Sequence, residues 1–361
     1  MLLSGCANAV AGLGEYIVPL YSPEYASGFR ILGAEGKLST VIVVSNPWQG
    51  ASDVENMLFV RRGSESIPEG FAGQVIEGDA CRVICMSSSH VAMLDAVGAA
   101  ETVAGVSGLR FVCNPVVRSS GAYDIGYDEN IDYERILSLM PDIVLLYGVN
   151  GSSPAQNKLD ELGVPYLYIG EYVEQTPLGK AEWMVAVAET VGRRETAQEV
   201  FRGIATRYNE LKAGVPESGR IPLVMLNTPY NDIWYMPSLK SYMVRLLEDA
   251  GGAYVYREND SGSSCPVDME DALRLLSKAD VWLNAQAASV NELCRDYPAL
   301  RDVPSLVSGR VYNCDRRTSE GRGNDFWETG VVEPDVVLRD LIGILHPELS
   351  LNDKPVYYRQ L

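Results

Sequence analysis

The chain has 361 residues, 47% of them hydrophobic and 22% charged, and it carries a formal net charge of −18 at pH 7. This length and composition favour two domains with sizeable apolar cores. The excess of acids excludes a basic surface for nucleic acid and opposes adsorption of a basic face to anionic lipid. No apolar run approaches the roughly 20 residues that span a bilayer.

The amino terminus carries a short motif, Leu3-Ser4-Gly5-Cys6. The motif resembles a bacterial lipobox, in which a lipid is attached to the cysteine after cleavage before it. It predicts a lipid on Cys6 and a tether over residues 1–28. The protein would then contact the membrane only through this lipid. A chance cysteine in a cytoplasmic terminus is the alternative.

Residues 29–78 are predicted to form a β-rich addition to which the sequence assigns no role. Apolar β-like runs occur at Thr40–Val44 and Met57–Val60, with turn residues between them. The addition precedes a first α/β lobe over residues 79–192.

In this first lobe, predicted strands alternate with predicted helices. Strand Arg82–Met86 leads into Ser87-Ser88-Ser89-His90, a serine cluster typical of a helix N-cap. The order then runs helix Val91–Val97, strand Thr102–Val106, helix Tyr133–Leu139, strand Ile143–Tyr147, helix Ala155–Leu162 and strand Tyr166–Ile169. Alternation with short links predicts a parallel sheet.

A long helix is predicted over residues 193–214, since apolar residues recur three and four apart. An earlier helix begins at Thr176-Pro177 and ends at Gly192. At 1.5 Å per residue the long helix spans about 30 Å, enough to bridge two lobes.

The second lobe, residues 215–361, repeats the scheme of the first. The predicted order is strand Leu223–Leu226, loop Asn227–Pro237, helix Ser241–Ala250, loop Ser261–Pro266, helix Glu270–Leu276, strand Val281–Asn284, helix Ser289–Cys294, strand Arg310–Asn313 and helix Val336–Leu345. The segment from Glu134 to Tyr147 matches that from Glu270 to Leu283: a helix opened by a carboxylate, a polar break and a buried strand. The chain is therefore predicted to be α/β, with two Rossmann-like lobes around central parallel sheets, joined by a single long helix.

Two facing lobes form a cleft, and ligands of α/β sheets bind beyond the carboxyl ends of the strands. The residues predicted there are His90, Tyr147 and Tyr172 on the first lobe, and Tyr230, Trp234, Arg316 and Trp327 on the second. Together with Arg118 and Arg317, such aromatics suit a large, partly apolar, anionic ligand. The alternative is that these aromatics pack on their own lobe, and that His90 has a structural role.

Several kinds of catalytic and metal site are absent from the sequence. It contains no Gly-x-Ser-x-Gly elbow, no Walker loop and no dinucleotide fingerprint. With only His90 and His346, a three-histidine metal site is excluded. We therefore expect a cleft that holds a ligand without catalytic residues, a cofactor or a protein-held metal. A two-lobed enzyme such as a nucleotide-sugar glycosyltransferase is the competing class.

The ordered segments resemble a known family, the periplasmic substrate-binding proteins of ABC importers for iron–siderophore, haem and cobalamin. The resemblance rests on Cys81–Gly98, Tyr133–Gly148, Lys158–Gly170, Glu195–Leu211, Asp280–Trp282, Pro177–Trp183 and Gly323–Gly330. It implies a class III binding-protein fold and a monomer, lipid-anchored in the periplasm. Such a protein captures a metal chelate and delivers it to a permease dimer with its ATPase. We expect the chelate to be an iron–siderophore, with haem and cobalamin as the alternatives.

Glu134 and Glu270 occupy equivalent places in the internal repeat. Their position matches that of the glutamates with which the family docks on its permease, one from each lobe. The alternative is that each acid is simply favoured at a helix start by the helix dipole.

Overall fold

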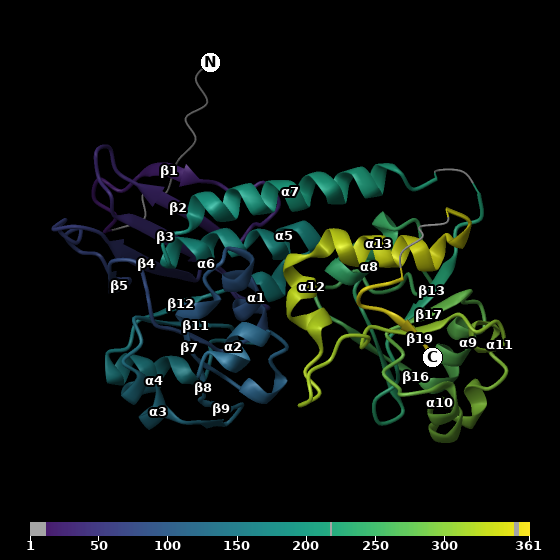
Figure 1. Ribbon diagram of the computed structural model, residues 1–361. Coiled ribbons are helices and arrows are strands. Elements are labelled where there is room, and N and C mark those ends of the chain that lie inside the picture. The colour runs from purple at the N-terminus through teal and green to yellow at the C-terminus, as the bar shows by residue number, and fades with distance from the viewer. Residues whose placement is uncertain (1–11, 217–218, 350–353) are drawn as a thin grey trace, which may run out of the picture.

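The computed structural model describes residues 12–216, 219–349 and 354–361 (Figure 1). Cys6 and its motif lie outside these ranges. The described residues contain three five-stranded sheets, one near the amino terminus and one in each of two α/β lobes, and two small two-stranded sheets. Among the described residues, no helix is long and apolar enough to cross a membrane.

The amino-terminal sheet has the order β1-β2-β3-β4-β5. Its strands are β1 (Val18–Tyr21), β2 (Phe29–Gly33), β3 (Thr40–Ser45), β4 (Glu55–Arg61) and β5 (Gln74–Glu77). All pairs are antiparallel except β4 with β5. Since β1 falls inside the range predicted as a tether, the sheet begins earlier than expected.

Both faces of this sheet are covered by apolar side chains. On β3, Ile42 and Val44 belong to the main core, whereas Val41 and Val43 pack in a small second core. The alternation follows from the period of two in a strand. The main core continues into the first lobe, so the sheet is packed on that lobe.

The first lobe holds a fully parallel sheet of order β12-β11-β6-β7-β8. Its strands are β6 (Val83–Cys85), β7 (Val103–Val106), β8 (Tyr123–Asp124), β11 (Ile143–Leu146) and β12 (Tyr166–Tyr168). Between and around them lie α1 (Ser88–Ala96), α2 (Pro115–Ser119), α3 (Tyr133–Leu139), α4 (Ala155–Leu162) and the small pair β9 (Gly126–Tyr127) and β10 (Asn130–Ile131). The structure confirms the predicted parallel sheet.

The second lobe holds a sheet of order β15-β13-β17-β18-β19, parallel except for β19. Its strands are β13 (Leu223–Leu226), β15 (Ala253–Tyr254), β17 (Val281–Leu283), β18 (Val311–Asn313) and β19 (Arg359–Gln360). Its helices are α8 (Tyr242–Asp249), α9 (Met269–Leu276), α10 (Val290–Asp296), α11 (Pro304–Val307), α12 (Thr329–Val332) and α13 (Pro334–Leu345).

The two lobes share one topology. The order β7-β6-β11-β12 in the first lobe corresponds to β15-β13-β17-β18 in the second. In both, the repeated helix (α3 or α9) leads into the strand beside the first strand of the lobe. The internal repeat seen in the sequence therefore reflects two similarly built lobes.

Helix α7 (Arg194–Ala213) joins the lobes and runs along one side of both (Figure 1). It packs on α6 (Met184–Thr190) of the first lobe and on α13 of the second. The helix predicted from Pro177 to Gly192 is divided at Trp183 into α5 (Pro177–Glu182) and α6.

Two segments predicted as loops contain strands instead. β14 (Ile233–Met236) pairs antiparallel with β16 (Cys265–Asp268), and Trp234 lies opposite Val267. Long-range pairing of this kind leaves little local signal, because each strand has only four residues and the connection between them includes a helix. The small sheet directs Trp234 into the second lobe.

Candidate ligand-binding cleft

A cavity of about 710 Å³ lies between the two lobes. Its walls come from three parts of the chain. They are Trp48–Gly50 of the amino-terminal sheet; Tyr172, Val173, Glu174 and Gln175 of the first lobe; and Asn227, Pro237, Ser238, Lys240–Met243, Gly262–Ser264, Asn284 and Trp327 of the second. Ligand pockets typically have volumes of about 300–1,000 Å³, so this cavity suits a small molecule.

The first-lobe wall is the segment that follows β12. It begins with a short 3-10 turn over Glu171–Val173, which leaves the Tyr172 ring 47% exposed at the cavity. Glu174 is buried, and its Oε1 accepts hydrogen bonds from the backbone N–H of Ser27 at 2.8 Å and the indole N–H of Trp183 at 3.0 Å. Because hydrogen bonds within the protein already engage the Glu174 carboxylate, Glu174 forms part of the wall without offering a free charge to a ligand.

On the second lobe, Asn227 and Asn284 directly follow strands β13 and β17. Both adopt a left-handed backbone conformation, with φ values of 64° and 58°. Asparagine tolerates this region better than most residues. The tight turns place both residues at the carboxyl edge of the sheet, where they line the cavity.

The cavity lining offers no unpaired formal charge. Only Glu174 and Lys240 are charged, and Lys240 Nζ lies 3.0 Å from Asp260 Oδ1. The bases expected to attract an anion are engaged or elsewhere: Arg118 pairs with Glu320 at 3.3 Å, and Arg317 pairs with Asp325 at 2.9 Å. The lining therefore gives no support to the predicted preference for an anionic ligand, which stays a prediction.

Of the seven residues predicted to contact ligand, Tyr172 and Trp327 line the cavity. Trp327 is 48% exposed, and its ring packs edge-on against Phe326. The structure places the other five outside the lining: His90, Tyr147, Tyr230, Trp234 and Arg316. Arg316 lines a separate hollow near Tyr358 and Arg359.

Trp234 is a core residue. It is fully buried, its Nε1–H donates to the Leu226 carbonyl at 2.8 Å, and its ring centroid lies 5.5 Å from that of Trp282. Tyr230 is 70% exposed at the start of the same small sheet. Tyr147 follows β11 as predicted, but its half-buried ring is not in the lining, and burial raises the pKa of its hydroxyl.

His90 belongs to a buried polar cluster beneath the cleft. Burial lowers the pKa of its ring, and this outweighs the opposing effects of Glu171 and the Leu145 carbonyl. Ser89 Oγ donates to Glu171 Oε1 at 2.6 Å. His90 is thus fully buried and outside the cavity lining, and neither of its ring nitrogens has a hydrogen-bond partner among the described residues.

Lys180 connects this cluster to the second lobe. Its ammonium donates to the Glu171 carbonyl at 3.0 Å and lies 4.6 Å from the centre of the Tyr242 ring on α8. Burial lowers the pKa of Lys180, although the Glu171 and Glu174 carboxylates act in the opposite direction. A cation facing an aromatic ring in a buried site is an attractive contact, so this pair links the two lobes.

Glu134 and Glu270 occupy matching places on the two lobes. Each is exposed in the first turn of its helix, two residues after an aspartate N-cap. Asp132 accepts from the N–H of Arg135, and Asp268 accepts from the N–H of Asp271. Since Asp132 and Asp268 are the N-caps, Glu134 and Glu270 are not needed to cap their helices.

Sequence reasoning missed most of the cavity lining. Asn227 could have been found, because it follows a predicted strand and the same rule gave Tyr172. Asn284 was predicted as the last residue of its strand, which the structure ends at Leu283. Trp48 and Gln49 could not, because they lie outside both lobes in the chain. Nothing local indicates that the connection between β3 and β4 reaches the cleft.

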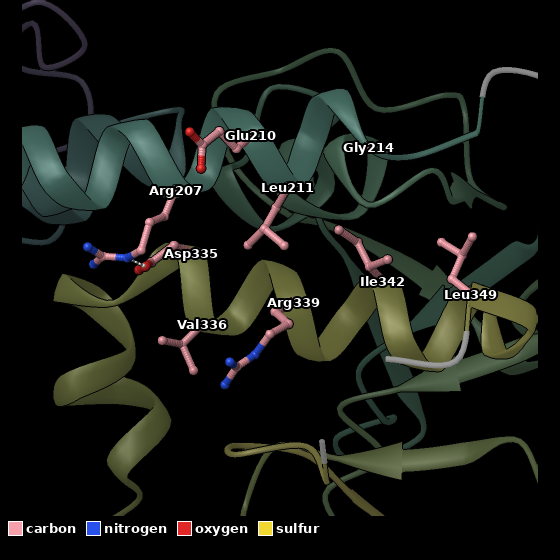
Figure 2. A pocket seen from close by; sticks show the side chains of 9 residues that line it. All are labelled: Arg207, Glu210, Leu211, Gly214, Asp335, Val336, Arg339, Ile342 and Leu349. Carbon is pink, nitrogen blue, oxygen red and sulfur yellow. Dashed lines mark hydrogen bonds and ion pairs between the residues drawn. The ribbon is translucent and has the colours of Figure 1, made fainter. Parts of the chain in front are cut away.

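A second hollow, of about 520 Å³, lies between α7 and α13 (Figure 2). Leu211, Val336 and Ile342 give it apolar walls, and Arg207 Nε pairs with Asp335 Oδ2 at 2.6 Å across it. It shares no lining residue with the cleft. It reflects how the linking helix packs on the second lobe.

Solved structures share this architecture. A periplasmic haem-binding protein from Pseudomonas aeruginosa matches with a TM-score of 0.58 and 18% identity, over 78% of this chain and 98% of that protein. The siderophore-binding protein FhuD of Vibrio cholerae, solved with Fe³⁺-Desferal bound, matches with a TM-score of 0.54 and 19% identity, over 73% and 99%. At these identities the likeness concerns the fold.

Among curated proteins, an uncharacterized lipoprotein of Methanocaldococcus jannaschii is 26% identical over 299 residues, which are 79% of this chain and 70% of that protein. The model of one family matches residues 83–318, which include most of both lobes and the linking helix. The chain belongs to the periplasmic binding protein family.

Proposed function

We propose that this protein captures a metal chelate in the cleft between its lobes and delivers it to the permease dimer of an ABC importer with its ATPase. The observation that carries the proposal is the cavity of about 710 Å³, lined by aromatic, amide and hydroxyl groups from both lobes. Members of this family bind solutes and are not enzymes, so the glycosyltransferase alternative is set aside.

A chelate fits this cleft better than a bare ion. Among the described residues, no group of three or more His, Cys, Asp or Glu side chains is placed to hold a metal. Aromatic faces and neutral polar groups suit an organic ligand that carries its own metal ligands. The haem and Fe³⁺-Desferal proteins with the same fold support this class of cargo. An iron–siderophore is our first choice, ahead of haem and cobalamin.

Calorimetry tests the proposal directly. The protein should bind one chelate class with a stoichiometry of one, and should not bind free Zn²⁺, Mn²⁺ or Fe³⁺. Tight binding of a free ion would contradict the proposal, and so would failure to bind any of the chelates.

Two aromatic residues of the cleft can be tested with a matched control. Tyr172→Ala and Trp327→Ala should each weaken binding roughly 10-fold or more, because buried aromatic contacts dominate binding energies. Tyr230→Ala removes a tyrosine that is exposed outside the cavity, so it should leave affinity unchanged. Equal effects of all three substitutions would argue against this cleft as the ligand site.

Docking on the permease is proposed to use Glu134 and Glu270. Within the described residues neither carboxylate has a hydrogen bond or ion pair, so both can meet basic groups on a two-fold partner. Exposed charges of this kind act mainly on association and specificity. The double variant Glu134→Ala with Glu270→Ala should bind chelate normally yet fail to stimulate the ATPase of the reconstituted transporter.

Glu195→Ala is the matched control for docking. Glu195 is likewise an exposed acid in the first turn of a helix, but on α7. It should leave ATPase stimulation intact. Full stimulation by the double variant would show that the two acids merely favour their helix starts.

The family and the lipoprotein relative support a place outside the cytoplasm. We propose a monomer in the periplasm, anchored to the membrane through a lipid on Cys6. Mass spectrometry of the amino-terminal peptide should reveal the lipid, and Cys6→Ala should release the protein from the membrane fraction. An unmodified Cys6 in membrane-bound protein would contradict the anchor.

A further inference from the structure

The connection between β3 and β4, residues 46–54, reaches the ligand cleft from outside the lobes. Trp48, Gln49 and Gly50 line the cavity together with Tyr172 and Gln175 of the first lobe. The family match begins at residue 83. This part of the wall therefore comes from a segment that the family match does not include.

The connection is held in one conformation. Asn46 adopts φ of 49°, and its backbone N–H donates to the Val54 carbonyl at 2.9 Å. The Asn46 side chain accepts from the Val54 N–H at 3.0 Å, which closes the base of the loop. The Trp48 ring lies edge-on to Tyr168 at 5.2 Å between centroids. The loop is thus tied both to itself and to strand β12.

Two glycines at strand ends of the first lobe allow the connection to come close. A Cβ on Gly148 would lie 3.0 Å from Trp48 Cε3 and 2.5 Å from the Gly151 carbonyl oxygen. A Cβ on Gly170 would lie 3.2 Å from the Pro47 Cα. Since real Cβ atoms rarely approach so closely, both glycines contribute to the close packing of the Trp48 segment on the carboxyl ends of β11 and β12, although Gly170 is crowded still more by Trp183 and Gly148 by the Gly151 carbonyl.

The polar groups facing the cavity from this wall are neutral. In the described part of the chain, the side-chain amides of Gln49 and Gln175 have no hydrogen-bonding partner, so both are available to a ligand. The nearby charges of Glu174 and Lys240 are satisfied within the protein. Lys240 is the one cation of the described lining, and it is half exposed and shared with Asp260, so a ligand with net charge would meet little fixed counter-charge here. The net charge of −18 further opposes an anion.

We infer that the amino-terminal sheet completes the binding site, and that Trp48 and Gln49 select a chelate without net charge that exposes carbonyl or amide groups. The inference rests on the proposed function. It gives a role to the β-rich addition: the addition narrows the cleft with one aromatic face and one carboxamide. Those groups suit a neutral ferric hydroxamate better than a ferric tris-catecholate or haem, whose charges would have no partner.

Isothermal titration of the full chain tests this with an uncharged ferric trihydroxamate, a ferric tris-catecholate and haem. The wild type should bind the hydroxamate more tightly than either charged chelate. Trp48→Ala should weaken hydroxamate binding roughly 10-fold or more, because it removes an aromatic anchor. Gln49→Ala should weaken it roughly 2- to 10-fold, because it removes one hydrogen bond. Trp48→Phe should retain most of the affinity, since the aromatic packing against Tyr168 persists.

Ser52→Ala is the control, because Ser52 lies on the same connection but outside the cavity lining. Its affinity and melting temperature should equal those of the wild type. A preference for a charged chelate, or unchanged hydroxamate affinity in both Trp48→Ala and Gln49→Ala, overturns the inference and leaves the proposed function standing. Failure of the wild type to bind any chelate overturns both.

Discussion

The first lobe has two neighbours, and it is joined to them by different numbers of buried carboxylates. Three buried carboxylates hold it to the amino-terminal sheet: Glu174, Glu182 and Glu189. Glu182 accepts four hydrogen bonds from residues 21–26, and Glu189 accepts from the Thr40 hydroxyl at 2.6 Å and the Arg62 guanidinium at 2.8 Å. Charge-assisted hydrogen bonds in buried sites are the stronger kind.

Toward the second lobe, by contrast, one buried carboxylate crosses the contact outside the cleft. Glu328 accepts from the backbone N–H groups of Cys113 and Asn114, both at 2.7 Å. Near Glu328, the backbone of Gly323 packs against the Phe111 carbonyl of the first lobe. An exposed ion pair between Arg118 of the first lobe and Glu320 of the second also crosses this contact.

The difference indicates which parts can move. The amino-terminal sheet and the first lobe behave as one body, because several saturated carboxylates fix them. The two lobes meet where α12 packs on α1 and α5, beside an open cavity, with α7 holding them at a set spacing. Closure around a ligand should therefore be small, and should displace the amino-terminal wall together with the first lobe.

Glu182→Ala should have the largest effect on stability. It leaves three backbone N–H groups and the Tyr21 hydroxyl without their acceptor in a site where the carboxylate is fully buried. Breaking such a buried charged contact costs about 3–5 kcal/mol, which urea denaturation would measure as a fall in the free energy of unfolding.

Glu55→Ala is the control for that experiment. Glu55 also lies in the amino-terminal sheet, but it pairs with Arg30 on the surface at 3.3 Å. The cost should be below about 1 kcal/mol. Similar small costs for both variants would mean that the sheet is not fixed to the lobe by its buried carboxylates.

Glu328 should make the contact between the lobes sensitive to pH. Burial raises the pKa of its carboxyl to about 7, against the opposing effect of the Cys113 and Asn114 N–H groups. A raised folded-state pKa means that the folded protein holds a proton which the unfolded chain releases between about pH 4.5 and 7. Stability therefore falls as pH rises through this window, by about 3 kcal/mol in total.

Glu328→Gln isolates that contribution. The variant keeps the size of the side chain and one carbonyl acceptor, but cannot ionise. The free energy of unfolding of the wild type, relative to this variant, should fall by about 3 kcal/mol between pH 4.5 and 8. A pH-independent difference would show that the carboxylate is as well accommodated here as in water.

The sequence predicted elements whose signals are local. Helices α3 and α4 and strand β13 have the predicted bounds, because residues such as Asp132 and Gly163 end or cap them and apolar residues mark one face. Trp234 was misplaced because the pairing of β14 with β16, which turns it inward, depends on segments far apart in the chain. The same holds for Trp48, which reaches the cleft only because Gly148 and Gly170 let a distant loop approach.

The smallest effect should come from the exposed charge pair between the lobes. The Glu320 side chain is 92% exposed and that of Arg118 is 38% exposed, with 3.3 Å between their charged atoms. Water and salt screen such a pair, and holding two long side chains together costs conformational entropy. A double-mutant cycle of Arg118→Ala and Glu320→Ala should give a coupling of at most about 0.5 kcal/mol, reduced further by added salt. A coupling as large as the effect of Glu328 would mean that surface charge also holds the lobes together, and the contrast between the two contacts of the first lobe would fail. A negligible coupling would leave the contact between the lobes to its buried groups, of which Glu328 and the Lys180–Tyr242 pair are two.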